Sequence, residues 1–373
     1  MFRFALRFIS YDKPKSIGVI LGIIISIFLV GQQTGIFLFL TGAMSSLVDN
    51  TEADLWVVDN QTTDVNALGQ IDIRIGHQLE SFSGVKKAYP IIIAGGSAKF
   101  KDGKSAPVQL IGSQPPHFIG GPWNIIDGKI TDLLEDGAIS LDYFEKENLN
   151  NAEVGSIFEI NGKRVWVAVQ TKGARGFGAT YVFTTASRAR ALASIPKTKV
   201  SAYLVDLEQN EDPLVVKDRI NTGLFGVRAW TKQEFSRSTV TTILSTSGIA
   251  FSIGTLIIFA AVSGMIIIGL TMYSAAVDRI KDYGTLKAIG ADNSYIRNLI
   301  LSQAFFFSVI GYSIAIVLIQ GFKRAIANSG ILFDYSLAIK ISFFIITLFI
   351  SLGGAVFAMH RIAKLEPASV FRT

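Results

Sequence analysis

Residues 278–297 read DRIKDYGTLKAIGADNSYIR, a short charged stretch between two long apolar runs. A bilayer is crossed by about 20 consecutive apolar residues in a helix. Runs of about that length or more, all without Asp, Glu, Lys or Arg, occur at 16–48, 238–277, 298–322 and 341–359. The sequence therefore predicts four transmembrane helices, and residues 278–297 form a loop on one side of the membrane.

The composition agrees with a membrane protein. Of the 373 residues, 50% are hydrophobic and 17% are charged, against roughly 25% charged residues in soluble domains. The chain has no cysteine, which excludes disulfides and cysteine-based metal sites. The net charge is +6. Beside apolar spans, basic residues set topology, so we expect the partner surface to be a lipid bilayer and no nucleic acid to bind.

The distribution of Lys and Arg predicts the orientation. Basic residues are concentrated at the N-terminus, in the loop and in the C-terminal tail, and such residues mark the cytoplasmic side. We expect both termini and the loop to be cytoplasmic in a multi-pass protein of the cell inner membrane. The predicted parts are a cytoplasmic segment at 1–15, a first span with a stalk at 16–48, an outer domain at 49–237, a stalk and second span at 238–277, the loop at 278–297, a third span at 298–322, a short outer loop at 323–340, a fourth span at 341–360 and a cytoplasmic tail at 361–373.

Two features near the N-terminus have alternative explanations. The first apolar run is far longer than the roughly 7–15 residues of a signal-peptide core, so we expect a membrane span there. Segment 1–15 begins MFRFALRFISY. It is either an amphipathic helix on the inner membrane surface or a plain basic flank of the first span.

The outer domain is predicted to be mixed α/β. Asn161-Gly162 suits the tight turn of a hairpin over 158–169, and Pro213 suits the first turn of a short helix. Pro90 indicates that the strand around it lies at an edge or a bulge. Further strands are predicted at 53–59, 85–94 and 200–207, and a pair of strands at 99–112.

The sequence has only weak candidates for nucleotide-binding, metal-binding or catalytic motifs. Gly103-Lys104-Ser105 is the end of a phosphate-binding pattern whose first glycine is replaced by Ala98, so we expect a turn and no nucleotide. The three histidines, at 77, 117 and 360, have no metal-ligand spacing. Acidic clusters at 145/147 and 208/211/212 are expected to face solvent. We therefore predict no enzyme activity, no metal and no bound cofactor for this chain.

The loop itself has the signals of two helices joined by a turn. Gly290 suits the position after a helix end, and Asp292, Asn293 or Ser294 can cap the helix that follows. We expect the first part of the loop to continue the second span as one helix. Apolar residues at 280, 283, 286 and 289 are expected to be exposed, which favours protein docking about as strongly as a plain re-entry turn.

One span, a large outer domain, three further spans and the loop sequence RIKDYGTLKAIGA at 279–291 together resemble the MacB/FtsX-type ABC transporter permeases. The stretches EADLWVVD, QLIG, TKQEF and EPA, at 52–59, 109–112, 231–235 and 366–368, resemble the DevC-like subgroup. The resemblance implies a membrane α-helical fold of four transmembrane helices, with a large mixed α/β, MacB-like periplasmic domain inserted between the first and the second.

The resemblance also implies a function, a set of partners and a site. Such a permease is no enzyme: it transmits motion from two copies of a separate cytoplasmic ABC ATPase, which hold ATP and Mg, to the periplasmic domain. It pairs with a second copy or a paralogue, and DevC-like systems add a periplasmic adaptor and an outer-membrane channel. The ATPase-coupling residues implied are Arg279, Asp282, Tyr283, Gly284, Leu286, Lys287, Ala288 and Gly290.

Three functions compete on this reading. The first is an export permease of a tripartite efflux or lipid/lipoprotein export system. The second is an FtsX-like transducer that activates a periplasmic cell-wall hydrolase. The third is a membrane-tethered outer enzyme.

Overall fold

The structure is a computed structural model that describes residues 13–363. The predictions for residues 1–12 and 364–373 lie outside this range. The chain divides into two compact units: unit 1 contains residues 13–39 and 249–363 of the described range, and unit 2 contains residues 40–248.

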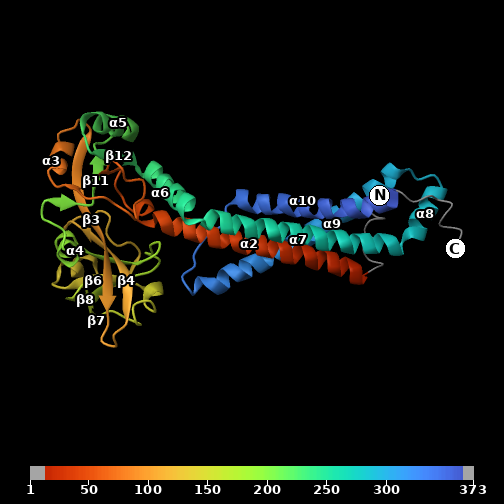
Figure 1. The fold of residues 1–373 in the computed structure, drawn as a ribbon, viewed down its shortest axis with the longest axis horizontal. Helices are drawn as coiled ribbons and strands as arrows, with labels where there is room; N and C mark the ends of the chain where they lie inside the picture. The colour runs from red at the N-terminus through yellow and green to blue at the C-terminus, as the bar shows by residue number, and fades with distance from the viewer. Residues whose placement is uncertain (1–12, 364–373) are drawn as a thin grey trace. The chain divides into compact units, whose positions relative to one another are not determined.

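Unit 1 is a bundle of long helices that run side by side (Figure 1). Within residues 13–363, four helices are long and apolar enough to cross a membrane. The first has 37 residues and is about 55 Å long at 1.5 Å per residue, which exceeds the hydrocarbon thickness of about 30 Å. The helices are α2 (Lys13–Asp49), whose last turns belong to unit 2, α7 (Ile249–Asp278), α8 (Ile280–Ala288), α9 (Asn293–Ala327) and α10 (Leu337–Ala363).

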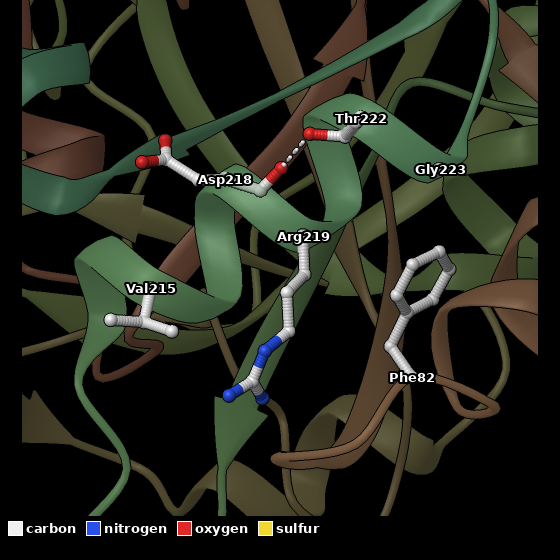
Figure 2. Close-up of a pocket in the computed structure, with 6 residues that line it drawn as sticks. All are labelled: Phe82, Val215, Asp218, Arg219, Thr222 and Gly223. Carbon is white, nitrogen blue, oxygen red and sulfur yellow. Dashed lines mark hydrogen bonds between the residues drawn. The ribbon is translucent and has the colours of Figure 1, made fainter.

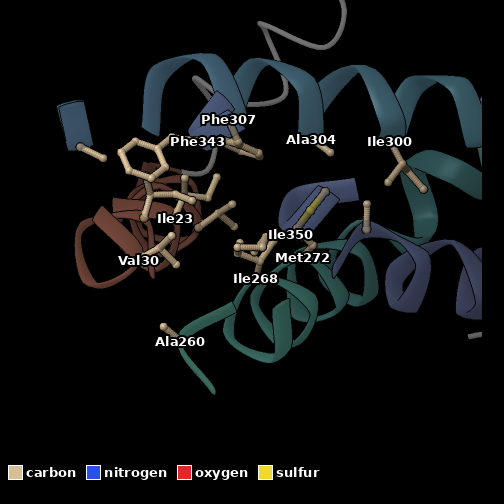
Figure 3. Close-up of a cluster of buried hydrophobic side chains, with 14 of the residues drawn as sticks. Ile23, Val30, Ala260, Ile268, Met272, Ile300, Ala304, Phe307, Phe343 and Ile350 are labelled. Atoms are coloured by element: carbon tan, nitrogen blue, oxygen red, sulfur yellow. The ribbon is translucent and has the colours of Figure 1, made fainter. Parts of the chain in front are cut away.

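Glycines bring α2 close to its neighbours. A Cβ atom at Gly22 would lie 2.9 Å from Ile267 of α7, and one at Gly311 of α9 would lie 2.5 Å from Ile23. Small residues let helices approach closely in a membrane, where packing replaces the hydrophobic effect as the main attraction between helices. Figure 3 shows the result: side chains of α2, α7, α9 and α10 point into one apolar cluster.

Unit 2 is built on a ten-stranded sheet in which β3 joins two groups of strands. The first half of β3 pairs with β11, and the second half pairs with β4 and, at its end, β7. The path runs β12-β1-β11-β3-β7-β8-β5; off this path, β4 pairs with β3, β9 pairs with β4, and β6 pairs with β8. The strands are β1 (Leu55–Asp59), β3 (Val85–Lys99), β4 (Ser105–Ser113), β5 (Ile125–Asp127), β6 (Ala138–Asp142), β7 (Ile157–Ile160), β8 (Lys163–Thr171), β9 (Thr180–Thr185), β11 (Ala202–Leu207) and β12 (Val227–Thr231), while β2 (Ile71–Asp72) pairs with β10 (Lys199–Val200).

Both faces of β1 are buried, which explains its continuous apolar sequence. Side chains alternate between the two faces of a strand. Leu55 and Val57 join one apolar cluster, and Trp56 and Val58 join another, which includes Phe235. The helices around the sheet are α3 (Ile75–Leu79), α4 (Ala186–Ala193), α5 (Pro213–Gly223) and α6 (Lys232–Ser247), with short 3₁₀ turns η1 (Ile130–Leu134) and η2 (Tyr143–Glu145).

Local signals in the sequence predict several of these elements correctly. β7 and β8 form the expected hairpin, with Asn161 at φ 51° and Gly162 at φ 76°. α5 begins at Pro213. β3 and β4 pair across the turn that holds Gly103 as expected, but the strands predicted at 85–94 and from residue 99 are one continuous strand, β3. At Pro90, β3 has a partner on one side only, β11, as expected for a proline.

The predicted stalk at 238–247 is helical and lies within α6, but it is not continuous with the second span. α6 is capped at Gly248, which adopts the left-handed conformation at φ 68°. A new helix, α7, begins at the next residue. Four apolar helices and a sheet-rich unit nevertheless agree with the predicted fold class.

Candidate functional site

The candidate site is α8 and the two turns that fix it between α7 and α9. The first turn is at Arg279, which interrupts the helix with φ −102° and ψ 22°. The expectation that the loop continues the second span as one helix is therefore wrong: α7 ends at Asp278, and α8 is a separate helix of nine residues.

The second turn is a Schellman motif centred on Gly290. Gly290 has φ +102°, and its N–H donates to the carbonyl of Lys287 at 3.1 Å. The N–H of Ala291 donates to the carbonyl of Leu286 at 2.9 Å. These are the two bonds that close a helix around a left-handed glycine, so the prediction for Gly290 is confirmed.

Asp292 starts the next helix. Its carboxylate accepts a hydrogen bond from the backbone N–H of Tyr295 at 2.7 Å, which caps α9. Of the three candidates for this cap, Asp292 is the one used. Because a cap stands directly after a Schellman motif, the path from α8 to α9 is fixed by two backbone hydrogen bonds and one from the backbone to the Asp292 carboxylate.

Tyr283 points into the helix bundle, contrary to the expectation that it is exposed. It is 3% exposed and belongs to the core of unit 1. Burial raises the pKa of the Tyr283 phenol. Leu286 packs partly against the same core. These two side chains anchor α8 to the bundle and do not form an outward apolar stripe.

The exposed side of α8, here called the α8 outer face, consists of Lys281, Asp282, Thr285, Ala288 and Ile289. These positions fall within one helical face because residues three and four apart are neighbours on a helix. Ile289 is 77% exposed, which makes it an apolar side chain open to a partner.

The eight predicted coupling residues do not lie on a single surface. Asp282, Ala288 and Gly290 are exposed, Tyr283 and Gly284 are buried, and Arg279, Leu286 and Lys287 are half-buried. The coupling residues implied by the resemblance do not include Lys281, Thr285 and Ile289, although Ile289 was expected to be exposed. Their signal is the helical period counted from an inward Tyr283, but the sequence alone does not show that Tyr283 faces inward.

An ion pair lies at the same end of unit 1. Lys15, in the first turn of α2, pairs with Asp278, the last residue of α7. The Lys15 ammonium also donates to the carbonyl of Ser274 at 3.3 Å. The start of α2 is thus joined to the end of the helix that leads into α8.

Unit 2 contains a buried ionic cluster where the sequence predicts a solvated face. Glu145 is 7% exposed; it pairs with Arg175 and accepts a hydrogen bond from Thr180. Nearby, Asp142 accepts hydrogen bonds from the N–H of Ala174 at 2.7 Å and the hydroxyl of Thr171 at 3.0 Å. The expectation for Glu145 is wrong. The groups are paired with protein partners, so the cluster is structural.

A hollow of about 700 Å³ lies on α5 beside Phe82 (Figure 2). Its polar groups are already bonded: Arg219 donates to the carbonyl of Ser83 at 2.9 Å, and Thr222 donates to the carbonyl of Asp218. In Figure 2 the Asp218 carboxylate points away from the Arg219 guanidinium. The hollow therefore holds no pair of groups arranged for acid–base chemistry.

Other chemistry has no support in the part of the chain described. Within residues 13–363, no group of three His, Asp or Glu side chains is placed to hold a metal ion. Lys104 pairs with Asp102 across the β3–β4 turn at 3.2 Å. The Gly103-Lys104-Ser105 sequence is a turn, as expected.

Comparison with known proteins matches the C-terminal part of the chain to a family. Residues 254–363, which include α8, match the FtsX-like permease C-terminal family. The chain contains an FtsX-like permease domain. This match confirms the resemblance to the MacB/FtsX superfamily, and the DevC-like subgroup stays a prediction. With four apolar helices, the permease domain makes the chain a membrane protein.

Solved structures give weaker likenesses. The periplasmic region of MacB from Actinobacillus actinomycetemcomitans is 11% identical, with a TM-score of 0.39, and the match covers 54% of this chain and 98% of that one. The extracellular domain of the noncanonic ABC-type transporter YknZ from Gram-positive bacteria is 14% identical, with a TM-score of 0.35, covering 48% and 99%. Neither TM-score establishes a common fold. No curated protein sequence matches the chain.

Proposed function

We propose that this FtsX-like permease is the membrane subunit of an ABC-type exporter and passes ATP-driven motion from a separate cytoplasmic ATPase to unit 2, outside the cytoplasm. The observation that carries the proposal is the α8 outer face, a short helix with an exposed Ile289 set between two membrane helices of the permease domain. The hydrogen bonds that fix the turn from α8 to α9 suit a surface that passes a push to the next helix.

The path toward unit 2 begins with α2. This helix continues without interruption to Asp49, and Leu47 and Val48 lie in the same apolar cluster as Trp56 of β1. Movement along α2 therefore acts on a packed core, which transmits strain because it is dense. The distribution of Lys and Arg supports a cytoplasmic α8 and an external unit 2.

The remaining partners belong to the same proposal. Two ATPase copies, which bring ATP and Mg, bind two permeases, either identical or paralogous. A periplasmic adaptor and an outer-membrane channel complete a tripartite system for efflux or lipid/lipoprotein export. An FtsX-like transducer would instead bind a cell-wall hydrolase, so the identity of the periplasmic partner separates the two functions.

The experiment is a pull-down with a tagged full-length chain, followed by mass spectrometry. An ABC ATPase should co-purify with the wild type. Ile289→Glu puts a charge on the α8 outer face and should reduce the recovered ATPase about tenfold, as for loss of one central apolar contact in an interface.

Phe225→Glu is the matched control, because Phe225 is an exposed apolar residue of unit 2. It should leave ATPase recovery unchanged. Equal recovery with Ile289→Glu and wild type would contradict docking at α8. An adaptor and channel among the recovered proteins support export, and a cell-wall hydrolase supports transduction.

A further inference from the structure

The segment that joins α9 to α10 is packed against α2. Residues 331–336 are neither helix nor strand, and their burial alternates. Phe333 and Tyr335 are buried, while Leu332 and Asp334 are exposed. Alternate side chains of an extended chain point to opposite sides, so two aromatic rings are directed into unit 1 from consecutive odd positions.

Two glycines of α2 receive these rings. The Tyr335 hydroxyl donates a hydrogen bond to the carbonyl of Gly31 at 2.8 Å. Gly35 lies one turn further along the same helix face, and a Cβ atom there would lie 2.5 Å from Phe333 Cζ and 2.7 Å from the Tyr335 hydroxyl. The missing side chain at Gly35 is what allows the tyrosine to reach the backbone of α2.

The segment is also attached to both helices that it joins. The ring centroids of Tyr335 and Phe343 of α10 are 5.5 Å apart, and those of Phe333 and Tyr335 are 5.2 Å apart. Asp334 pairs with Lys323 near the end of α9. Edge-on aromatic pairs of this spacing are favourable beyond their buried area. The segment therefore cannot shift without also shifting its contact with α2.

We propose that residues 331–336 pass movement of α9 to α2, and that Tyr335 is the positioning residue that holds α2 in register. The inference rests on the proposed function, for which it supplies the route. α8 is fixed to the start of α9 by the Schellman motif and the Asp292 cap. The far end of α9 continues into residues 331–336, and α2 carries the movement to the core that holds Leu47 and Val48.

Two pairs of variants isolate this contact. Gly35→Ala places a methyl group where Phe333 and Tyr335 lie, and Gly42→Ala makes the same change on the same helix where nothing lies within 4 Å. Tyr335→Phe keeps the ring and removes only the hydrogen bond to Gly31. Tyr273→Phe is its control, at an exposed tyrosine of α7. If Gly35→Ala does not fold, Tyr335→Phe alone still tests the contact between residues 331–336 and α2.

The measurement is a spin-label distance across unit 1. The chain has no cysteine, so Leu29→Cys on α2 and Phe259→Cys on α7, both exposed, give two specific labels. The labelled chain is studied in complex with the ABC ATPase recovered in the pull-down. The distance is measured without nucleotide and after trapping with MgATP and vanadate, together with the ATP hydrolysis rate.

Trapping should change the distance in the wild type and in both controls. In Gly35→Ala and Tyr335→Phe, the coupling between nucleotide trapping and the change in spin-label distance should weaken about threefold to tenfold, as for other residues within a coupling network. ATP hydrolysis should continue in both variants. Loss of the distance change with hydrolysis retained shows uncoupling, which a merely structural role does not produce.

Two results overturn the inference in distinguishable ways. A full distance change in both Gly35→Ala and Tyr335→Phe rejects residues 331–336 as the route but leaves the proposed function standing. No distance change in the wild type rejects ATP-driven movement of α2, and with it the proposed function and this inference together.

Discussion

Asp142 of unit 2 is 1% exposed, and its environment predicts a pH effect. Burial raises the pKa of its carboxyl group, although backbone N–H groups of Ala174 and Phe144 donate to it. The folded state therefore binds this proton more tightly than the unfolded chain. As the pH rises from about 4 through the raised pKa, the free energy of unfolding contributed by Asp142 must fall.

Asp142→Asn tests this sign because asparagine does not titrate. With rising pH, the stability of the variant should improve relative to wild type, by at most about 1.4 kcal/mol per pH unit. The four tryptophans, at 56, 123, 166 and 230, all lie in unit 2, so urea unfolding followed by tryptophan fluorescence reports on this unit. A stability difference that stays constant from pH 4 to 8 would contradict the assigned shift.

The residues of α8 show what sequence can and cannot tell at this scale. Gly290 and Asp292 are predictable because the turn and the cap depend on neighbouring residues only. The direction of Tyr283 depends on α9, whose Ile296, Leu299 and Ile300 lie in the same buried cluster. A helical period identifies faces but not which face another helix covers. The sequence therefore identifies Ile289 as one of four apolar residues, with 280, 283 and 286, but does not show that it is the most exposed of the four.

At the scale of elements, Gly248 separates two helices that their composition would join. Its φ of 68° costs a residue with a Cβ atom about 1–2 kcal/mol, and nothing lies within 4 Å of the position. Gly248→Ala should therefore destabilise the end of α6 through backbone strain alone. Gly42→Ala, in helical backbone with equally open space, should be neutral or stabilising by up to about 1 kcal/mol.

Urea unfolding followed by tryptophan fluorescence compares the two alanine variants, since both positions belong to unit 2. Gly248→Ala should unfold at a lower urea concentration than wild type, and Gly42→Ala should not. Equal midpoints would mean that residue 248 can become helical, so that α6 and α7 form the single helix predicted from composition.

The strands follow the same division between local and distant information. The β7–β8 hairpin was readable because Asn161-Gly162 forces its turn. The position of β11 between β1 and β3 is not predictable from local signals, because Trp56 of β1 pairs with Leu204 of β11, which lies far along the sequence. The buried Glu145 was missed for the same reason: its partner Arg175 is separated from it by β7 and β8.

For the whole molecule, the proposed function depends on the side of the membrane that each unit faces. Both proposals need α8 in the cytoplasm and unit 2 outside it. The charge distribution favours this orientation, because Lys and Arg near spans are retained on the cytoplasmic side. The chain is well suited to a direct measurement, since it has no cysteine of its own.

Single-cysteine variants at Ile289 and Phe225 test the orientation. Ile289 is on the α8 outer face, and Phe225 is 96% exposed in unit 2, so both thiols should react with a membrane-impermeant maleimide when the reagent reaches them. In intact spheroplasts Phe225→Cys should be labelled and Ile289→Cys should not. Opening the inner membrane should expose Ile289→Cys to the reagent. If both react before the membrane is opened, α8 and unit 2 face the same side, and a cytoplasmic ATPase could not act on one to move the other.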